Sequence, residues 1–155
     1  MKMKIRKATK KDEERVVELF REYDKYENKL DKRHKVSSKQ ESKEFFNKLI
    51  KSKISIFLVL EADSKIEGVI SGEHRNTLMG RNCIIHELII SKNYRGKGAG
   101  KRLMKEFENQ AKKKGCKSVQ SFVLIGNKKV LNFYKKLKYS YDEEGFVIRK
   151  KLKWK

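Results

Sequence analysis

Apolar residues in the first third of the chain recur every three or four positions, which is the spacing of helices that bury one face. A short strand is predicted over 3–7, before this pattern begins. Thr9 with Asp12, and Ser38 with Glu41, form capping-box sequences that predict where two helices start. The apolar faces of these helices are Val16, Leu19, Phe20 and Tyr23 in the first, and Phe45, Phe46, Leu49 and Ile50 in the second. The polar stretch 24–36 between them is predicted to be irregular.

From residue 54 the helical period gives way to runs of β-branched and other apolar residues, which favour strands. Strands over 54–62 and 66–73 are predicted to form a hairpin around a turn at 63–64. A second turn is predicted at 76–81, followed by a third strand of this region over 83–90.

Helices and strands are predicted to alternate in the second half of the chain. A glycine-rich loop over 95–100 leads into a helix that is expected to end at Gly115. The apolar face of this helix is Leu103, Met104, Phe107 and Ala111. A strand over 117–124, a helix over 127–137 and a final strand over 146–152 complete the predicted elements.

The order of these elements, β-α-α-β-β-β-α-β-α-β, defines a fold class. The hairpins imply antiparallel neighbours, whereas the strand–helix–strand unit around 95–115 implies a parallel pair. The length of 155 residues is that of one ordinary domain. We therefore predict a single α/β (α+β) domain over residues 1–155, with a mixed, mostly antiparallel central sheet and helices on both faces.

Charge widens the range of partners without choosing among them. Lys and Arg number 41 against 20 Asp and Glu, a formal net charge of +21. Such a charge attracts polyanions such as nucleic acid or phosphorylated cofactors. The basic residues are spread over the whole chain, so a solvated Lys-rich surface explains the excess equally well.

The cysteines and the absence of long apolar runs indicate a cytoplasmic protein. Cys83 and Cys116 form no CxxC pair and lie in apolar contexts, so both are interpreted as buried free thiols. No apolar run reaches the roughly 18 residues of a membrane span. The charged start of the chain has no apolar segment behind it, so neither a signal peptide nor a membrane partner is predicted.

The loop over 95–100 carries the most informative chemistry. Gly96, Gly98 and Gly100 alternate where a predicted strand ends and a helix begins. Glycine allows positive φ and close approach of a ligand, and the first amides of a helix have no acceptor within it. The neighbouring cations are Lys97, Lys101 and Arg102. These residues predict a phosphate or pyrophosphate site. The alternative is a tight turn among solvated lysines.

The glycine spacing disfavours two common nucleotide-binding loops. A Walker A loop has four residues between its glycines and a Ser or Thr after its Lys, whereas here three residues separate Gly96 from Gly100 and Arg102 follows Lys101. A dinucleotide fingerprint would need a third glycine at the position of Lys101.

The loop resembles the acetyl-CoA loop of the GNAT superfamily, Arg/Gln-x-x-Gly-x-Gly/Ala, at Arg95, Gly98 and Gly100. A second GNAT signature, Asn-x-x-Ala-x-x-Phe-Tyr-x-Lys-x-Gly-Phe, is matched by Asn127, Phe133, Tyr134 and Lys136. The sequence differs from this signature at Val130, Lys138 and Tyr139. Lys138 replaces the glycine that usually stops this helix, so a different helix end is expected. The resemblance implies a GNAT-like architecture and an acetyl-CoA-dependent N-acetyltransferase.

The same resemblance implies how the substrate acetyl-CoA is held. Its pantetheine arm would lie against the predicted strand before the loop, and its pyrophosphate would meet the loop amides. The residues implied to contact it are Leu88, Ile89, Ile90, Arg95, Gly96, Lys97, Gly98, Ala99, Gly100, Lys101, Asn127 and Tyr134. No metal is implied.

The catalytic residues implied by the resemblance are Tyr134, Glu87 and His86. In this superfamily an amine attacks the thioester directly, while a main-chain amide near Leu88 or Ile89 polarises its carbonyl. Tyr134 would protonate the departing thiolate, which is downhill from a phenol with a pKa near 10 to a thiol near 8.5. His86 and Glu87 are both candidates for the base. The alternatives are that His86 is structural and that Glu87 pairs with a surface lysine.

The implied acceptor is a primary amine: a polyamine, a protein or peptide amine, or a small amine metabolite. Acceptor specificity in the superfamily comes from the first two helices and their connection. This region holds Glu22, Asp24, Glu27 and Asp31. They would attract a cationic acceptor if they face the cleft; alternatively, they pair with neighbouring lysines.

Two further hypotheses concern partners. By analogy with the superfamily, a homodimer is one expected state. The competing functional classes are a basic nucleic-acid-binding module, for which core-like aromatics are unfavourable, and a CoA-sensing module without turnover.

Overall fold

The computed structural model describes residues 2–141 and 150, in two compact units, Met1–Phe122 and Val123–Lys155, each of which is described by itself. The first unit contains β1 (Met3–Lys7), α1 (Glu13–Leu30), α2 (Lys39–Lys51), β2 (Ser55–Ala62), β3 (Lys65–Thr77), β4 (Gly80–Ile90), α3 (Ala99–Lys113) and β5 (Ser118–Ser121). The second contains α4 (Lys128–Lys136). The strand predicted over 146–152 lies outside the described residues. That 1–155 forms one domain stays a prediction.

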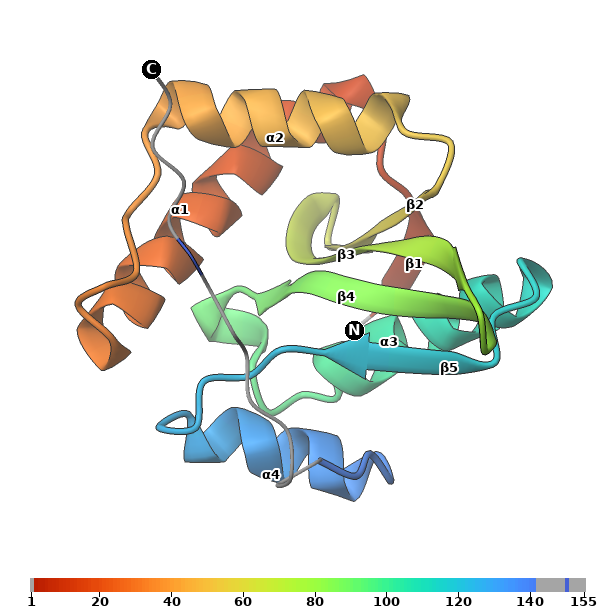
Figure 1. The fold of residues 1–155 in the computed structure, drawn as a ribbon. Helices are drawn as coiled ribbons and strands as arrows, with labels where there is room; N and C mark the ends of the chain where they lie inside the picture. Colours follow the sequence, from red (N-terminus) through yellow and green to blue (C-terminus); the bar gives the residue numbers. More distant parts are fainter. Residues whose placement is uncertain (1, 142–149, 151–155) are drawn as a thin grey trace, which may run out of the picture. The chain divides into compact units, whose positions relative to one another are not determined.

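The strands form one sheet in the order β1-β2-β3-β4-β5. The pairs β1–β2, β2–β3 and β3–β4 are antiparallel, whereas β4 and β5 are parallel. Helices α1 and α2 cover one face of this sheet and α3 covers the other (Figure 1). The predicted mixed, mostly antiparallel sheet with helices on both faces is confirmed.

The face under α1 and α2 holds one apolar core. Val69 and Ile89 are cross-strand partners, so their side chains share a face, and both are buried in one cluster with the apolar faces of α1 and α2. Within it, the Phe57 ring lies 5.4 Å from that of Phe46 and 6.5 Å from that of Phe20, measured between centroids. The predicted apolar faces of both helices therefore pack on this side.

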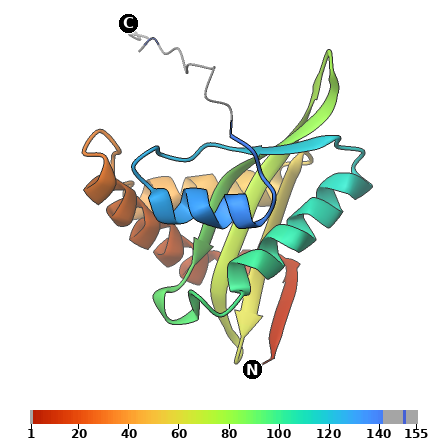
Figure 2. The same ribbon diagram turned by 90° about the horizontal axis from the view of Figure 1, so that it is seen from below.

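The opposite face approaches α3 closely because β3 carries two glycines there (Figure 2). A Cβ at Gly72 would lie 2.6 Å from Phe107 Cζ and 2.2 Å from the Ile84 carbonyl oxygen. A Cβ at Gly68 would lie 3.0 Å from Leu103 Cδ1. These glycines give the apolar face of α3 room to seat on the strands.

Helix α1 is longer than the sequence pattern predicts. The segment 24–30, predicted to be irregular, continues the helix to Leu30. The apolar period stops at Tyr23 because the next inward position is Glu27, a carboxylate that is only 5% exposed. Hydrophobic spacing does not predict a helix where the buried position is occupied by a polar residue.

The strand boundaries also differ from prediction at two places. The turn predicted at 76–81 narrows to two residues, because Thr77 pairs with Gly80 and β3 and β4 extend to meet it. The strand predicted over 117–124 narrows to Ser118–Ser121, the residues that pair with β4. The hairpin at 63–64 is confirmed, with Asp63 and Ser64 both at positive φ, 49° and 62°.

Two helices end in the same backbone motif with different residues. In α3 the predicted stop is confirmed: Gly115 has φ 78° and the Cys116 amide donates to the Ala111 carbonyl at 3.0 Å. In α4 the equivalent left-handed position is Lys138, with φ 67°, and the Tyr139 amide donates to the Tyr134 carbonyl at 3.1 Å. The expected change at this helix end is therefore wrong, since Lys138 adopts the conformation that glycine usually takes.

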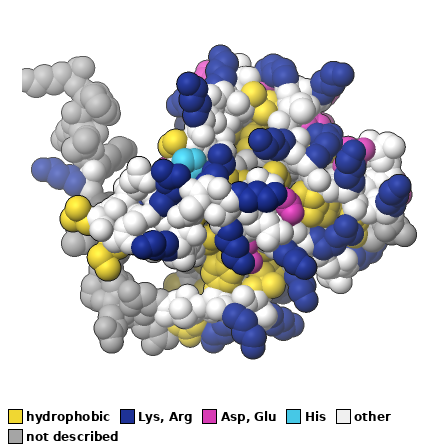
Figure 3. All heavy atoms as spheres, turned by 90° about the vertical axis from the view of Figure 1, so that its right-hand side faces the viewer, with side chains coloured by type: hydrophobic (Ala, Val, Ile, Leu, Met, Phe, Trp, Pro, Cys, Tyr) yellow, Lys and Arg dark blue, Asp and Glu magenta, His cyan; other side chains and the backbone are white. Residues whose placement is uncertain are grey.

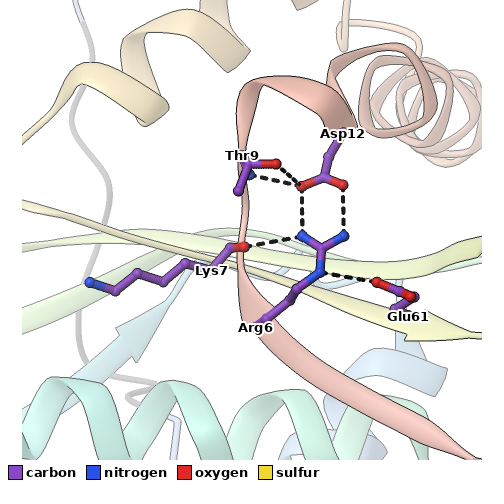
Figure 4. Close-up of polar contacts among 5 residues, drawn as sticks. All are labelled: Arg6, Lys7, Thr9, Asp12 and Glu61. Carbon is purple, nitrogen blue, oxygen red and sulfur yellow. Dashed lines mark hydrogen bonds and ion pairs between the residues drawn. The ribbon is translucent and has the colours of Figure 1, made fainter.

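A polar cluster fixes β1 to the start of α1 (Figure 4). The Arg6 guanidinium donates to both carboxylate oxygens of Asp12, at 2.8 and 2.9 Å, and to Glu61 on β2 at 3.0 Å. The Thr9 amide also donates to Asp12, at 2.8 Å. The hydrogen bond from Arg6 lowers the pKa of Asp12, whose side chain is 6% exposed.

We expect Asp12→Asn to lower the free energy of unfolding by about 1–3 kcal/mol at pH 7, because it removes one partner of a buried ion pair. Since the folded pKa of Asp12 lies below its unfolded value, the stabilisation is present above about pH 4 and is lost as the pH falls through the folded pKa. Urea unfolding at pH 7 and pH 3 should therefore show a difference that shrinks in acid. Glu18→Gln, in an exposed pair with Arg15, is the control. Equal midpoints for the three proteins at pH 7 would contradict this account.

Candidate active site

The loop between β4 and α3 presents unpaired amides at the start of the helix. Gly98 is the residue before α3, with φ 80°, and Gly96 has φ 73°. The space beside both is open, with no atom within 4 Å of an added Cβ. The first helical hydrogen bond runs from the Arg102 amide to the Gly98 carbonyl at 3.1 Å, so Ala99, Gly100 and Lys101 have no acceptor within the helix. This arrangement fits a diphosphate.

Side chains of the loop hold its shape. Arg95 Nε donates to the Ile90 carbonyl at 2.9 Å, and the Tyr94 hydroxyl donates to Asp63 at 2.9 Å. The Lys97 ammonium lies 5.1 Å from the centroid of the Tyr94 ring. The third cation expected to charge the loop, Arg102, instead donates to the Met3 carbonyl at 2.8 Å. Its guanidinium is thus bonded to β1.

Strand β4 extends beyond the end of its pairing with the parallel strand β5. Its pairing with β5 ends at Ile85, opposite Ser121, whereas β4 continues to Ile90. Over 86–90, no strand of the described residues pairs with this side of β4. In an extended strand alternate N–H and C=O groups point away from the other neighbour. Backbone groups of Leu88–Ile90 can therefore bond an extended ligand, as expected for the pantetheine arm.

A β-bulge at His86 changes which face of the sheet each β4 side chain occupies. Ser71 pairs with Glu87 and Gly72 pairs with Ile85, so His86 is an extra residue without a cross-strand partner. Strict alternation would place Ile85 and Glu87 on one face. With the bulge, Ile85 lies on the α3 face and Glu87 on the face covered by α1 and α2.

The carboxyl of Glu87 has an unusual environment. Its Oε2 atom is buried and has no hydrogen-bond partner among the described residues. Burial, and then the carboxylates of Asp24 and Glu27 on α1, raise the pKa of Glu87 to about 8. A buried carboxyl that titrates near neutral pH is suited to accept a proton from an ammonium group. The alternative that Glu87 pairs with a surface lysine is not what the structure has.

The neighbouring His86 is in a different setting. Its side chain is 35% exposed and its Nε2 lies 3.7 Å from the Glu73 carboxylate on β3. It thus lies near a surface acid, beyond hydrogen-bond distance. Glu87, whose Oε2 atom is buried and whose pKa is raised, is therefore the base candidate that the structure favours.

The four acidic residues expected at the acceptor site divide into two groups. Asp31 accepts hydrogen bonds from Arg33, and Glu22 lies 3.7 Å from Arg15. These two acids thus pair at the surface, with arginines instead of the lysines that the alternative named. Asp24 and Glu27 lie instead near Glu87. The sequence pattern did not predict that Asp24 and Glu27 act together on Glu87, because residues 24–30 were predicted to lie outside the helix.

The second unit contains the matched residues of the second signature. The Asn127 side chain is 4% exposed and accepts a hydrogen bond from the Val130 amide at 3.3 Å, so it caps α4. Tyr134 is buried, with its ring 5.5 Å from that of Phe133 and 5.2 Å from that of Tyr139. The roles of Asn127 and Tyr134 toward the substrate stay predictions.

The cysteines are free thiols with different burial. Cys83 is fully buried and burial, with Cys116 beside it, raises the pKa of its thiol to about 12. Such a thiol is a poor nucleophile. Cys116 is only half-buried, which differs from the expectation that both are buried.

A family model described as the acetyltransferase (GNAT) family matches residues 14–139. An uncharacterised N-acetyltransferase of Methanocaldococcus jannaschii is 30% identical over 146 residues, 90% of this chain and 61% of that protein. A thialysine N-epsilon-acetyltransferase of Mus musculus is 37% identical over 60 residues, 39% of this chain and 35% of that protein. The chain thus spans about three fifths and one third of the length of these two curated relatives.

Solved structures share the fold. A tetramutant of the Bacillus halodurans protein BH1408 matches with a TM-score of 0.84 at 18% identity, covering 94% of this chain and 99% of that one. An aminoglycoside N-acetyltransferase solved in complex with CoA matches with a TM-score of 0.80 at 16% identity, covering 97% and 96%.

The protein belongs to the acetyltransferase (GNAT) family. The resemblance seen at the glycine loop and the second signature is thereby confirmed.

The basic surface does not by itself define a nucleic-acid site. On the face shown in Figure 3, Lys and Arg side chains are spread widely, with fewer Asp and Glu among them. Phe20, Phe46 and Phe107 are buried, as expected of core aromatics. Nucleic-acid binding, a homodimer and a cytoplasmic location stay predictions. Among the described residues, no helix has the length and apolar character needed to cross a bilayer.

Proposed function

We propose that this protein transfers the acetyl group of acetyl-CoA directly to a primary amine, with Glu87 as the general base. The observation that carries the proposal is the buried Oε2 atom of Glu87, which has no hydrogen-bond partner among the described residues and lies on the strand that leads into the glycine loop. Family membership supports acetyl-CoA as the donor, and the open amides of Ala99–Lys101 support a diphosphate at the start of α3.

The reaction needs two proton movements at the acceptor nitrogen. The carboxylate of Glu87 takes the first proton from the ammonium group, which frees the nitrogen lone pair to attack the thioester carbonyl carbon. A main-chain amide of Leu88 or Ile89 would donate to the developing oxyanion. As the carbon–sulfur bond breaks, Tyr134 protonates the thiolate. The nitrogen then loses its second proton to solvent, solvent returns a proton to the Tyr134 phenolate, and Glu87 releases the first proton to solvent. The products are an N-acetylamine, CoA as its thiol and one released proton.

The activity is tested by thiol release from acetyl-CoA with a panel of amines: polyamines, lysine peptides, free amino-terminal peptides and small amines. We expect amine-dependent release of thiol, and Tyr134→Phe should lower kcat by about 100-fold or more through loss of the proton donor. Tyr141→Phe, at a tyrosine that is 52% exposed, is the matched control. If no amine releases thiol, the proposed activity is wrong. If Tyr134→Phe turns over like the wild type, the acid is another group.

A further inference from the structure

Two acidic side chains between β4 and α1, those of Glu27 and Glu87, lack a balancing Lys or Arg among the described residues. Glu27 is 5% exposed, and neither Glu27 nor Glu87 makes an ion pair with a Lys or Arg of residues 2–141. The chain carries 41 Lys and Arg, so their absence here cannot follow from scarcity. Buried carboxyl groups without a cationic partner destabilise a fold. A Lys or Arg side chain at this place would remove that destabilisation.

A second observation points to a missing ligand at the same place. Glu87 Oε2 and Ser71 Oγ are both buried without a hydrogen-bond partner among the described residues. Ser71 is fully buried and pairs across the strands with Glu87, so the two side chains lie next to each other on the face under α1. Buried polar atoms are normally bonded. These two are the groups that an amine nitrogen would satisfy.

Asp24, whose charge helps to raise the pKa of Glu87, is held in place by the segment that follows α1. The Ser37 amide donates to its Oδ2 at 3.0 Å, and the His34 Nε2 lies 3.1 Å from its Oδ1. Asp24 precedes Glu27 by three residues, so the two carboxyls share one side of α1. The loop between α1 and α2 thus orients one carboxylate, and the helix places the second a turn further on.

From this arrangement we infer that the acceptor carries at least two cationic groups, and that it is a linear aliphatic di- or polyamine. Its reacting nitrogen meets Glu87 and Ser71, and its second ammonium binds Asp24 and Glu27. A slender chain suits the site because Glu27 and Glu87 Oε2 are almost closed to solvent. The inference rests on the proposed function for the reacting end, whereas the binding of the second ammonium stands apart from turnover.

The test compares 1,4-diaminobutane with n-butylamine, which has the same carbon chain and one amine. We expect kcat/KM of the wild type to be at least about 10-fold higher for the diamine, since one charged hydrogen bond contributes about that factor. Glu27→Gln, and separately Asp24→Asn, should bring the ratio close to one, mainly through a higher KM for the diamine. Glu14→Gln, at an exposed position of the same helix, is the matched control and should keep the wild-type ratio.

Calorimetric titration with spermidine measures binding without turnover. We expect heat with the wild type and Glu14→Gln and at least about 10-fold weaker affinity with Glu27→Gln. Equal kcat/KM for the diamine and the monoamine, or a ratio that survives both substitutions, would overturn the inference. A higher kcat/KM for an aminoglycoside than for spermidine would contradict the inference that the acceptor is a linear chain. If no amine releases thiol yet spermidine binds as described, the proposed function fails and the polyamine site stands.

Discussion

Glu87→Gln should lower kcat/KM for amine acetylation by about 100- to 10,000-fold at neutral pH, the usual contribution of a general base. Glutamine keeps the size of the side chain but cannot take a proton from the acceptor ammonium. Binding of acetyl-CoA should change little, because the expected contacts of that substrate lie on the edge of β4 and in the glycine loop. His86→Gln, one residue away and exposed, should stay within about threefold of the wild type, since removing an exposed pair has a small effect.

The pH profile gives this prediction a second readout. Because the pKa of Glu87 is raised to about 8, the fraction of carboxylate, and with it the wild-type rate, should rise through pH 8. The carboxylates of Asp24 and Glu27 on α1 repel the negative charge of ionised Glu87, so the rise in rate with pH occurs at high pH. In Glu87→Gln this rise in rate with pH should be absent. A variant with the wild-type profile would assign the proton transfer to another group.

The same substitution should raise stability while it lowers activity. A carboxyl whose folded pKa lies above its unfolded value, near 4.3, binds more protons folded than unfolded between the two, so it destabilises the fold increasingly as the pH rises from about 4 to 8. Thermal melting of Glu87→Gln should therefore exceed the wild type at pH 8 and match it near pH 4. Opposite changes in stability and rate are the mark of a group kept for function.

Gly98→Val should weaken acetyl-CoA binding by about 100-fold or more, equivalent to about 2.7 kcal/mol. Gly98 has φ 80°, which a β-branched residue rarely adopts, and its side chain would enter the open space in front of the α3 amides. The loop would have to change its conformation and lose the pattern of unpaired donors. Calorimetric titration with acetyl-CoA measures this loss.

Gly115→Val separates strain from ligand contact. Gly115 has φ 78° and open space around it, as Gly98 does, but it ends α3 instead of starting it. Both variants should lose comparable stability, whereas only Gly98→Val should lose affinity. If the two variants bind acetyl-CoA equally well, the diphosphate does not lie at the start of α3.

Local signals predicted the parts of the fold that depend on near neighbours in the chain. The capping box at Ser38 and Glu41 starts α2 as expected, with both reciprocal hydrogen bonds formed. The helical spacing of Leu103 and Phe107 marked the buried face of α3, and Gly115 marked its end. Each of these depends on residues within a few positions, where the physics of backbone and side chain acts without the rest of the molecule.

The backbone conformation of the glycine loop was likewise determined by the sequence alone. Positive φ at Gly96 and Gly98, and free amides after them, follow from residue type and from the start of a helix. The direction of the Arg102 side chain did not follow, because its acceptor, the Met3 carbonyl, comes from a strand 99 positions away.

Only the tertiary structure decided which acid is suited to act as a base. Strict alternation along β4 would place Ile85 and Glu87 together, and the bulge that separates them exists only in register with β3. Likewise, Glu27 is buried, and ends the apolar period of α1, because α1 packs over β4 near Glu87. The sequence by itself determined the helix starts, the hairpin at 63–64 and the glycine loop, since these arise from local backbone preferences. The shifted pKa of Glu87 arises from long-range burial and charge, which no local pattern encodes.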